Sequence, residues 1–297
     1  MASVEVSNGI TIEYEMRGDG EPILFIMGLG GQLIDWPEEF VDLFTARGYQ
    51  VIRFDNRDAG LSSQSDWEPP TMRKSMMSML SRRPLRGVGY TVEDMAVDAA
   101  QLLGVLNIDS AHVVGISMGG MIAQAMAVNH PNKVRSLCSI ASKPGDPKSG
   151  GIAPSLIRKL WKRPEPTIKS AADESVRIFR AISGDHFDAE SHRLNATASV
   201  QRSFTPTGTA RQAAAIGASP DRTKRLAQVT VPTLVVHGMK DPLVKPSGGI
   251  ATARAIPSSR LLMLPDTGHD LPRPRWQELC DVIVANIERA RALTPTP

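Results

Sequence analysis

The chain has 297 residues, of which 41% are hydrophobic and 22% charged, and its formal net charge at pH 7 is +3. This composition is typical of a globular protein, and the length fits one large α/β domain or two smaller domains. The small net charge gives no support to a nucleic-acid partner. Because no apolar run reaches about 18 residues, we expect no membrane-spanning helix.

Buried strands alternate with helical patterns along most of the chain. A hairpin around Asn8-Gly9 opens the chain and joins strands at Val4–Val6 and Thr11–Met16. Further strands are expected at Pro22–Ile26, Gln50–Phe54, Ala111–Val114, Val134–Ile140, Pro232–Val236 and Arg260–Leu264. Helices are expected at Trp36–Arg47, Thr91–Leu106, Met121–Val128 and Arg275–Arg291. This alternation predicts an α/β fold whose mostly parallel sheet is covered by helices on both faces.

The alternation of strands and helices is broken between residues 144 and 228. This stretch is polar, rich in helical patterns and punctuated by Pro and Gly, so we interpret it as a helical cap. The cap is then an insertion into a core formed by residues 1–143 and 229–297. It holds 14 Lys and Arg residues against 8 Asp and Glu residues. This excess indicates a solvated basic face or, as the alternative, attraction of an anionic substrate or interface.

A smaller insertion, residues 71–90, carries methionines at helical spacing: Met72, Met76 and Met79. One interpretation is a short helix that packs these side chains against the body of the protein. The other is an apolar pocket, because methionine is flexible and polarisable and forms adaptable walls. We expect this insertion and the cap to cover such a pocket together.

The amino terminus and the cysteines indicate a compartment. Residues 1–6 read Met-Ala-Ser-Val-Glu-Val, without the basic segment and apolar core of a secretory signal. Cys138 and Cys280 fall in apolar patterns, so we expect two buried free thiols and no disulfide. The sequence therefore predicts a cytoplasmic protein.

The segment Gly115–Gly120 reads Gly-Ile-Ser-Met-Gly-Gly and carries the most specific chemical signal in the chain. A buried strand precedes it and a helical pattern follows it, which is the context of a nucleophile elbow. In such a sharp turn, the flanking glycines leave room for the backbone, and the hydroxyl of Ser117 projects from the end of the sheet. We therefore predict that Ser117 is a catalytic nucleophile.

A serine hydroxyl is a weak nucleophile until a base accepts its proton. His269 is our candidate base, because it follows the strand Arg260–Leu264 and so emerges at the carboxyl end of a parallel strand, where ligands bind. Asp241 follows the preceding strand and is the candidate that orients the imidazole, with Asp146 as the weaker alternative. The other histidines fall in a strand, at a helix end or in the predicted cap: His112, His237, His130, His186 and His192.

The negative charge that develops on a substrate carbonyl oxygen needs two backbone donors. The N–H of Met118 is one candidate, since it lies at the start of the helix after the nucleophile. The other is the N–H of Leu29, in the glycine-rich loop Met27–Gly31 that follows the strand Pro22–Ile26. Gly28, in the same loop, is a candidate residue of the substrate pocket, together with the three methionines of the smaller insertion.

The order nucleophile, acid, histidine matches that of α/β hydrolases. Over essentially its whole length the chain resembles this superfamily, and within it the actinobacterial esterases related to aclacinomycin methylesterase. The segments that carry the resemblance are Trp36–Phe40, Arg53–Gly60, His112–Gly119 and Val231–Val235. Two positions depart from the pattern. Met27 stands where the superfamily often has His, and Asp58 stands where many relatives have Gly.

The motifs and the resemblance together predict a serine hydrolase that cleaves a small to medium, largely apolar carboxylic ester through an acyl-enzyme. The alternatives are a cofactor-free perhydrolase related to haloperoxidases, a thioesterase, a phospholipase-like hydrolase and a non-enzymatic ligand receptor on the same scaffold. The sequence has no His-Glu-x-x-His motif and no paired Cys and His ligand spacing, so we expect no metal and no cofactor. We expect a small-molecule ester as partner, no nucleic acid and no stable membrane anchor, and we leave self-association open.

Overall fold

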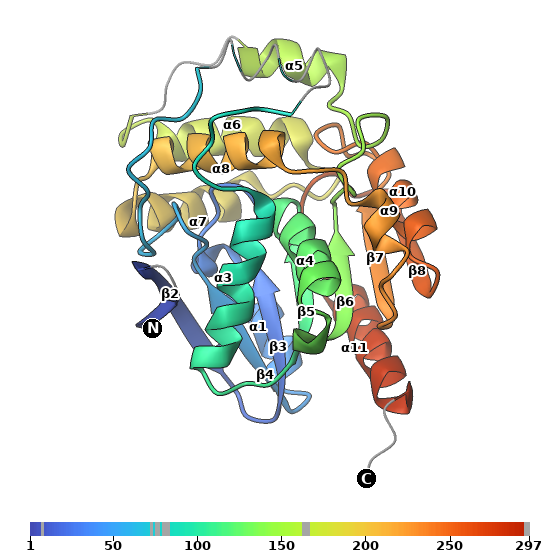
Figure 1. Cartoon of the computed structure of the whole chain (residues 1–297). Coiled ribbons are helices and arrows are strands. Elements are labelled where there is room, and N and C mark those ends of the chain that lie inside the picture. Colours follow the sequence, from blue (N-terminus) through green and yellow to red (C-terminus); the bar gives the residue numbers. More distant parts are fainter. Residues whose placement is uncertain (7–8, 72–73, 75–77, 79–83, 162–166, 294–297) are drawn as a thin grey trace.

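A single mixed sheet forms the centre of the molecule in the computed structural model (Figure 1). The structure describes residues 1–6, 9–71, 74, 78, 84–161 and 167–293. Within these residues, eight strands form the sheet in the order β1-β2-β4-β3-β5-β6-β7-β8. The strands are β1 (Ala2–Val6), β2 (Ile10–Arg17), β3 (Glu21–Ile26), β4 (Tyr49–Phe54), β5 (Ala111–Ile116), β6 (Val134–Ile140), β7 (Thr233–Gly238) and β8 (Ser259–Leu264).

Strand directions confirm the predicted mostly parallel sheet. The hairpin strands β1 and β2 pair antiparallel, and β2 also pairs antiparallel with β4. From β4 to β8 every neighbouring pair is parallel. The carboxyl ends of these parallel strands therefore meet at one edge of the sheet, where the loops that follow β3, β4, β5, β7 and β8 lie together.

Helices cover both faces of the sheet, as predicted. On one face, α3 (Val92–Val105) packs against α4 (Met118–Asn129), which contacts β5 and β6. On the other face, α1 (Glu38–Thr45) contacts β4 and α11 (Trp276–Leu293), and α11 also contacts β6 and β7. Between β7 and β8, α10 (Ser247–Ala255) packs against both of these strands.

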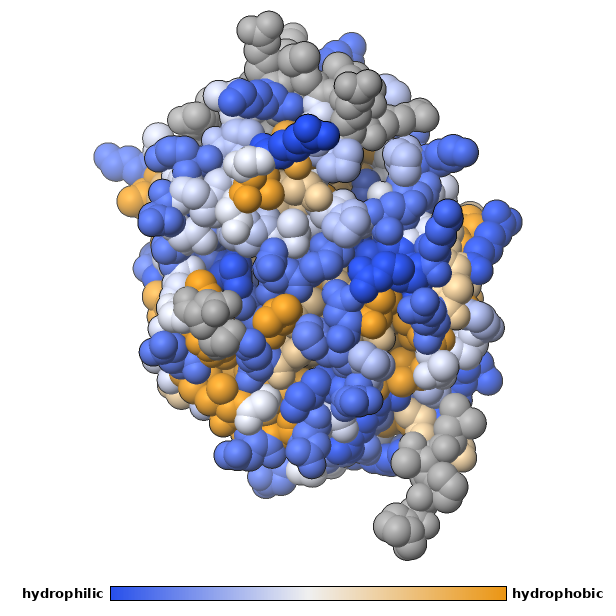
Figure 2. Space-filling view, in the orientation of Figure 1, coloured by the Kyte–Doolittle hydropathy of each residue, from blue (hydrophilic) through white to orange (hydrophobic). Residues whose placement is uncertain are grey.

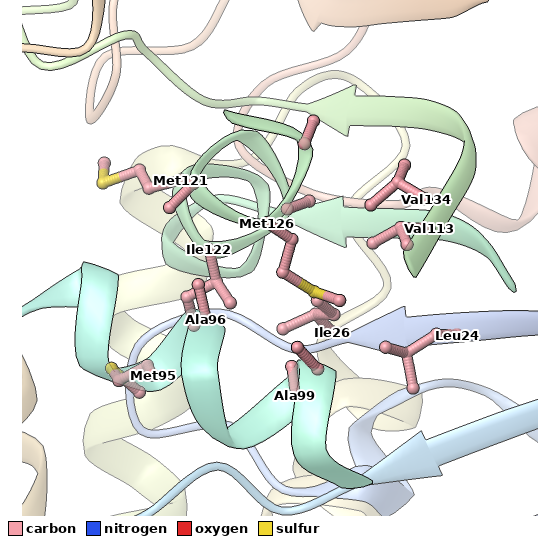
Figure 3. Close-up of a cluster of buried hydrophobic side chains, with 14 of the residues drawn as sticks. Leu24, Ile26, Met95, Ala96, Ala99, Val113, Met121, Ile122, Met126 and Val134 are labelled. Carbon is pink, nitrogen blue, oxygen red and sulfur yellow. The ribbon is translucent and has the colours of Figure 1, made fainter. Parts of the chain in front are cut away.

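The alternation of side chains along β3 divides the core into two layers. Leu24 and Ile26 belong to the buried cluster under α3 and α4, which Figure 3 shows with methionines and alanines from these helices. Ile23 and Phe25 point to the other face and join the buried cluster under α1 and α11. Because both faces are buried, the strand is a continuous apolar run instead of an alternating pattern.

The start of the first predicted helix differs from the structure. The prediction placed the helix at Trp36–Arg47, but α1 begins at Glu38, after Pro37, and Trp36 follows a short 3₁₀ turn. Trp36 is fully buried and stacks on Phe40, with 6.2 Å between the ring centroids. Its apolar spacing therefore reflects core packing and not helical backbone.

The segment between β6 and β7 is helical within the described residues. Its helices are α5 (Pro154–Trp161), α6 (Ala171–Ile182), α7 (Ala189–Arg202), α8 (Pro206–Ala218) and α9 (Thr223–Leu226). Figure 1 shows α6, α7 and α8 stacked over one end of the sheet, with α5 above them, whereas α9 contacts α4 and α10. The division into a core and a cap at 144–228 stays a prediction.

The surface hydropathy, the length of the helices and the state of the two cysteines can each be compared with what the sequence predicts. The face shown in Figure 2 is mostly hydrophilic, and its hydrophobic residues form small separate areas. Among the described helices, none is long and apolar enough to cross a bilayer. Cys138 and Cys280 are both buried and free, as predicted.

A glycine at the start of α4 tests how tightly this helix packs on the sheet. A Cβ added at Gly119 would lie 2.0 Å from the carbonyl oxygen of Ile26, at the end of β3. We therefore expect Gly119→Ala to lower the free energy of unfolding by about 1–3 kcal/mol, because the backbone must shift to admit the methyl group. Urea unfolding followed by circular dichroism measures this change.

Gly104 is the matched control, because it lies in α3 and a Cβ there would meet no atom within 4 Å. We expect Gly104→Ala to raise the free energy of unfolding by about 0.4–1 kcal/mol through the smaller entropy of the unfolded chain. Equal effects of the two substitutions would contradict the close contact between α4 and β3.

Candidate active site

Ser117 occupies a strained turn between β5 and α4. Its backbone angles are φ 56° and ψ −117°, a conformation that L-residues rarely adopt. The Ser117 N–H donates to the carbonyl oxygen of Ile140 at 2.8 Å, and the Ser142 hydroxyl donates to the carbonyl oxygen of Ser117, also at 2.8 Å. A Cβ at Gly115 would lie 2.1 Å from the carbonyl oxygen of Gly119. The turn therefore requires the glycines that the sequence motif supplies.

The structure brings the three predicted catalytic residues together from three separate loops. His269 follows β8, and its Nε2 lies 2.9 Å from the Ser117 Oγ. Asp241 follows β7, and its Oδ2 lies 2.6 Å from the His269 Nδ1. With its proton on Nδ1, His269 donates a hydrogen bond to Asp241, and Nε2 is free to accept the Ser117 proton. This arrangement can generate a serine alkoxide nucleophile.

The alternative acid, Asp146, does not contact this histidine in the structure. Its Oδ1 accepts the backbone N–H groups of Lys148 and Ser149, at 2.8 and 3.0 Å. The carboxylate of Asp146 thus organises its own turn. Of the two carboxylates weighed in the sequence, only Asp241 lies within hydrogen-bond distance of His269.

The surroundings of Asp241 favour its ionised form. The Oδ1 atom accepts the backbone N–H groups of Leu243 and Val244, each at 2.8 Å. The Oδ2 atom faces His269 and, at 3.5 Å, the Nε2 of the fully buried His237. Burial raises the pKa of Asp241, but the hydrogen bonds from His237 and His269 outweigh it and leave the pKa below its ordinary value. The carboxylate therefore stays charged and can stabilise a positively charged imidazole.

The loop after β3 lies against Ser117. A Cβ added at Gly28 would lie 3.2 Å from the Cβ of Ser117, so the backbone of this loop reaches the serine itself. Within the described part of the chain, the N–H groups of Leu29 and Met118 donate no hydrogen bond. Two free donors next to a serine hydroxyl are what an oxyanion hole requires.

Two polar side chains hold the loop after β3, in which Met27 stands where the superfamily often has His. The Asn56 side chain, in the loop after β4, donates to the carbonyl oxygen of Met27 at 3.0 Å. Gln212, in α8, accepts a hydrogen bond from the N–H of Gly30 at 2.8 Å. Neither residue was predicted from the sequence to belong to the site. Asn56 lies in Arg53–Gly60, one of the segments that carry the family resemblance, and it follows β4 at the edge of the sheet where the parallel strands end. No local sequence signal marks Gln212.

The loop that carries His269 is held by the carboxyl end of α6. The N–H of His269 donates to the carbonyl oxygen of Ile182 at 2.8 Å. A Cβ at Gly268 would lie 2.3 Å from that same oxygen, so the two backbones are in direct contact. The Gly184 N–H also donates to Asp270 Oδ1 at 3.2 Å, and burial raises the pKa of this carboxyl.

Asp58, the second departure from the family pattern, adopts a conformation that favours glycine. Its φ is 65°, and its side chain is fully buried. The Oδ1 atom accepts the N–H of Ser65 at 2.7 Å and lies 3.3 Å from the Arg211 guanidinium. Aspartate tolerates the left-handed region better than most residues, and these contacts satisfy its Oδ1 atom.

The proposed pocket is described only in part. Gly28 lies at Ser117, as stated above, whereas Met72, Met76 and Met79 lie outside the described residues. In the ranges that are described, no group of three or more His, Cys, Asp or Glu side chains is arranged to hold a metal ion.

Comparisons with known proteins agree with this fold. A family model described as "alpha/beta hydrolase fold" matches residues 21–272. Rhodomycin D methylesterase of Streptomyces peucetius is 27% identical over an alignment that covers 95% of this chain and 96% of the relative. A putative non-heme bromoperoxidase of Mycobacterium tuberculosis is 28% identical, and the alignment covers 88% of this chain and 91% of the relative. The crystal structure of an enol-lactonase from Burkholderia xenovorans LB400 matches with a TM-score of 0.72 and 21% identity, covering 97% of this chain and 100% of the other.

The carboxylate that orients His269 can be identified by its effect on the reactivity of Ser117. In Asp241→Asn, an amide N–H facing Nδ1 favours the tautomer whose Nε2 carries the proton and cannot accept one from Ser117. We expect the rate of covalent labelling by a fluorophosphonate probe to fall on the order of 10³-fold or more. Intact-protein mass spectrometry over time measures this rate.

Asp146→Asn serves as the control, because the Asp146 carboxylate bonds only to its own turn in the described structure. Its labelling rate should stay within about twofold of the wild type. A normal rate for Asp241→Asn together with a slow rate for Asp146→Asn would reverse the assignment.

Proposed function

The chain belongs to the α/β-hydrolase family and is a hydrolase, and on this premise we propose that it hydrolyses carboxylic esters with Ser117 as nucleophile. His269 is the base, and Asp241 orients it. The observation that carries the proposal is the pair of hydrogen bonds that His269 makes, 2.9 Å to Ser117 and 2.6 Å to Asp241. Nucleophile and base are thus within reach of each other, and a third group holds the base.

The proposed reaction has two halves. The Ser117 Oγ attacks the carbonyl carbon of the ester while His269 Nε2 accepts the hydroxyl proton. The tetrahedral intermediate then collapses, the bond to the leaving alcohol breaks, and His269 returns the proton to that alcohol. A water molecule, deprotonated by His269, attacks the acyl-enzyme and releases the carboxylic acid together with free Ser117.

The N–H groups of Leu29 and Met118 stabilise the oxyanion of both tetrahedral intermediates in this proposal. Both donors are free within the described chain, and Met118 is the first residue of α4. The positive end of a helix dipole therefore lies at the oxyanion, which adds to the stabilisation.

We propose a small to medium, largely apolar ester as the substrate. Leu29 follows Gly28, whose backbone reaches Ser117, and its side chain is 43% exposed. An exposed apolar side chain at this place suits an apolar acyl or alcohol group. The relative from Streptomyces peucetius is called a methylesterase, so methyl esters belong among the substrates to be tested.

The arginines of segment 144–228 bear on a phosphate-bearing substrate. Three of them pair with carboxylates of the sheet loops or of α3: Arg202 with Asp55, Arg211 with Asp58 and Arg222 with Glu93. Arg211 and Arg222 are buried, and the side chain of Arg202 is 12% exposed. Charges that are already paired and buried are not available to a substrate phosphate. This observation favours a neutral ester over the thioesterase and phospholipase-like alternatives that depended on a basic cap.

A perhydrolase is the second candidate, because a relative is called a putative non-heme bromoperoxidase. In that reaction hydrogen peroxide replaces water and attacks the acyl carbon of the acyl-enzyme, the bond from that carbon to the Ser117 oxygen breaks, and the acyl group is released as a peracid. The same nucleophile, base and oxyanion donors serve both reactions. Bromide oxidation in the presence of acetate and hydrogen peroxide distinguishes a perhydrolase from a simple esterase.

Replacing the nucleophile tests the proposed function. We expect Ser117→Ala to fold normally. Its turnover in ester hydrolysis should fall by roughly three or more orders of magnitude, because no acyl-enzyme can form without the serine hydroxyl. The measurement is hydrolysis of p-nitrophenyl esters from acetate to octanoate and of apolar methyl esters. Medium-length acyl groups should be preferred over acetate.

Labelling by a fluorophosphonate, with the modified peptide identified by mass spectrometry, complements this test. The probe should mark Ser117 in the wild type and leave Ser117→Ala unlabelled. A label on a different serine, or full ester hydrolysis by Ser117→Ala, would refute the proposal.

A further inference from the structure

Gln212 is a fully buried polar residue of α8 that connects two loops of the candidate active site. Its side-chain oxygen accepts the N–H of Gly30 at 2.8 Å, in the loop after β3. Its side-chain nitrogen donates to the carbonyl oxygen of Arg57 at 2.7 Å, in the loop after β4. A buried amide is costly unless both of its ends are paired, and here both are.

The loop that Gln212 contacts is a tight turn with a defined peptide orientation. The Gly31 N–H donates to the carbonyl oxygen of Gly28 at 3.1 Å, so residues 28–31 form a β-turn. Gly30 has φ 70°, whereas Leu29 is not among the residues with positive φ. This combination is the type II turn, in which the central peptide points to the opposite side from its direction in type I.

The hydrogen bond from Gly30 therefore fixes the central peptide of this turn, the one that joins Leu29 to Gly30. The neighbouring peptide, between Gly28 and Leu29, carries the proposed oxyanion donor. The α8 helix also packs closely here, because a Cβ at Gly30 would lie 2.9 Å from the hydroxyl oxygen of Thr209. A rotation of the central peptide would break the bond to Gln212 and loosen the adjacent donor.

We propose that Gln212 is a positioning residue for the oxyanion hole, which it aligns from the helical segment between β6 and β7. Gln212 does not touch the substrate; it acts through the turn Gly28–Gly31. This inference rests on the proposed ester hydrolysis and assigns to α8 an effect on the rate of the chemical step. A misplacement of about 1 Å in a catalytic group can cost on the order of 10²-fold in rate.

The test compares Gln212→Met with the wild type. Methionine keeps the length of the side chain but removes both hydrogen bonds. We expect kcat for a p-nitrophenyl ester to fall by about tenfold or more, with KM within about twofold. The inhibition constant of a trifluoromethyl ketone, whose adduct with Ser117 carries an oxyanion, should rise by a similar factor to the fall in kcat/KM.

Asn195→Ala is the matched control. The Asn195 side chain, in α7, donates to Asp35 at 2.7 Å, so it is another hydrogen bond between this helical segment and a loop of the sheet. It makes no contact with Gly30, and its loss should leave kcat and the inhibition constant nearly unchanged. An equal loss of kcat in both variants would mean that any loosening of the helical segment slows the reaction, and the inference would be wrong.

The remaining outcomes distinguish a failure of the proposed function from a failure of the role of Gln212. If the wild type hydrolyses no ester, the proposed function fails. If the wild type is active and Gln212→Met keeps its kcat, or changes KM alone, only the role of Gln212 fails. Gln212→Leu is the second variant if Gln212→Met does not fold. Rapid hydrogen exchange of the Gly30 amide in the wild type, followed by NMR, would also overturn the inference.

Discussion

The backbone of Ser117 is the constraint on which the rest of the site depends. A non-glycine residue with φ 56° costs of order 1–3 kcal/mol, and it persists only where its surroundings leave no alternative. Here the surroundings are the hydrogen bond to Ile140 in the neighbouring strand and the direct contact of α4 with the end of β3. Once this turn is fixed, the Cα–Cβ bond of Ser117 has one direction, and His269 and the loop after β3 are arranged around its side chain.

The sheet and the helices between β6 and β7 both contribute to this arrangement. The sheet supplies the ends of its strands, which place Ser117, Asp241 and His269 at one edge. The helices between β6 and β7 then hold the loops from above: α6 through Ile182 at the histidine loop, and α8 through Gln212 at the turn after β3. The second set of contacts is between backbone groups or amides whose hydrogen bonds are satisfied, so it orders the loops without placing further charge near Ser117.

How far the sequence could predict this structure depends on how local each signal is. The parallel sheet, the turn at Ser117 and the positions of Asp241 and His269 each follow from a strand pattern and the few residues after it, and the structure places these three side chains together. Trp36 was wrongly placed in a helix, because burial in an aromatic cluster imitates helical spacing. Gln212 could not be predicted, since a glutamine in an alanine-rich helix has no local sequence signal and its partner lies 182 residues away.

The buried ion pairs between the helical segment and the rest of the chain limit how this segment can be exchanged during evolution or engineering. Arg202 and Arg211 are the partners of Asp55 and Asp58, both fully buried. A helical segment transplanted from a relative without these arginines would leave two carboxylates uncompensated, and breaking such a pair costs about 3–5 kcal/mol. New substrate ranges obtained by swapping this segment would therefore require compensating changes in the loop after β4.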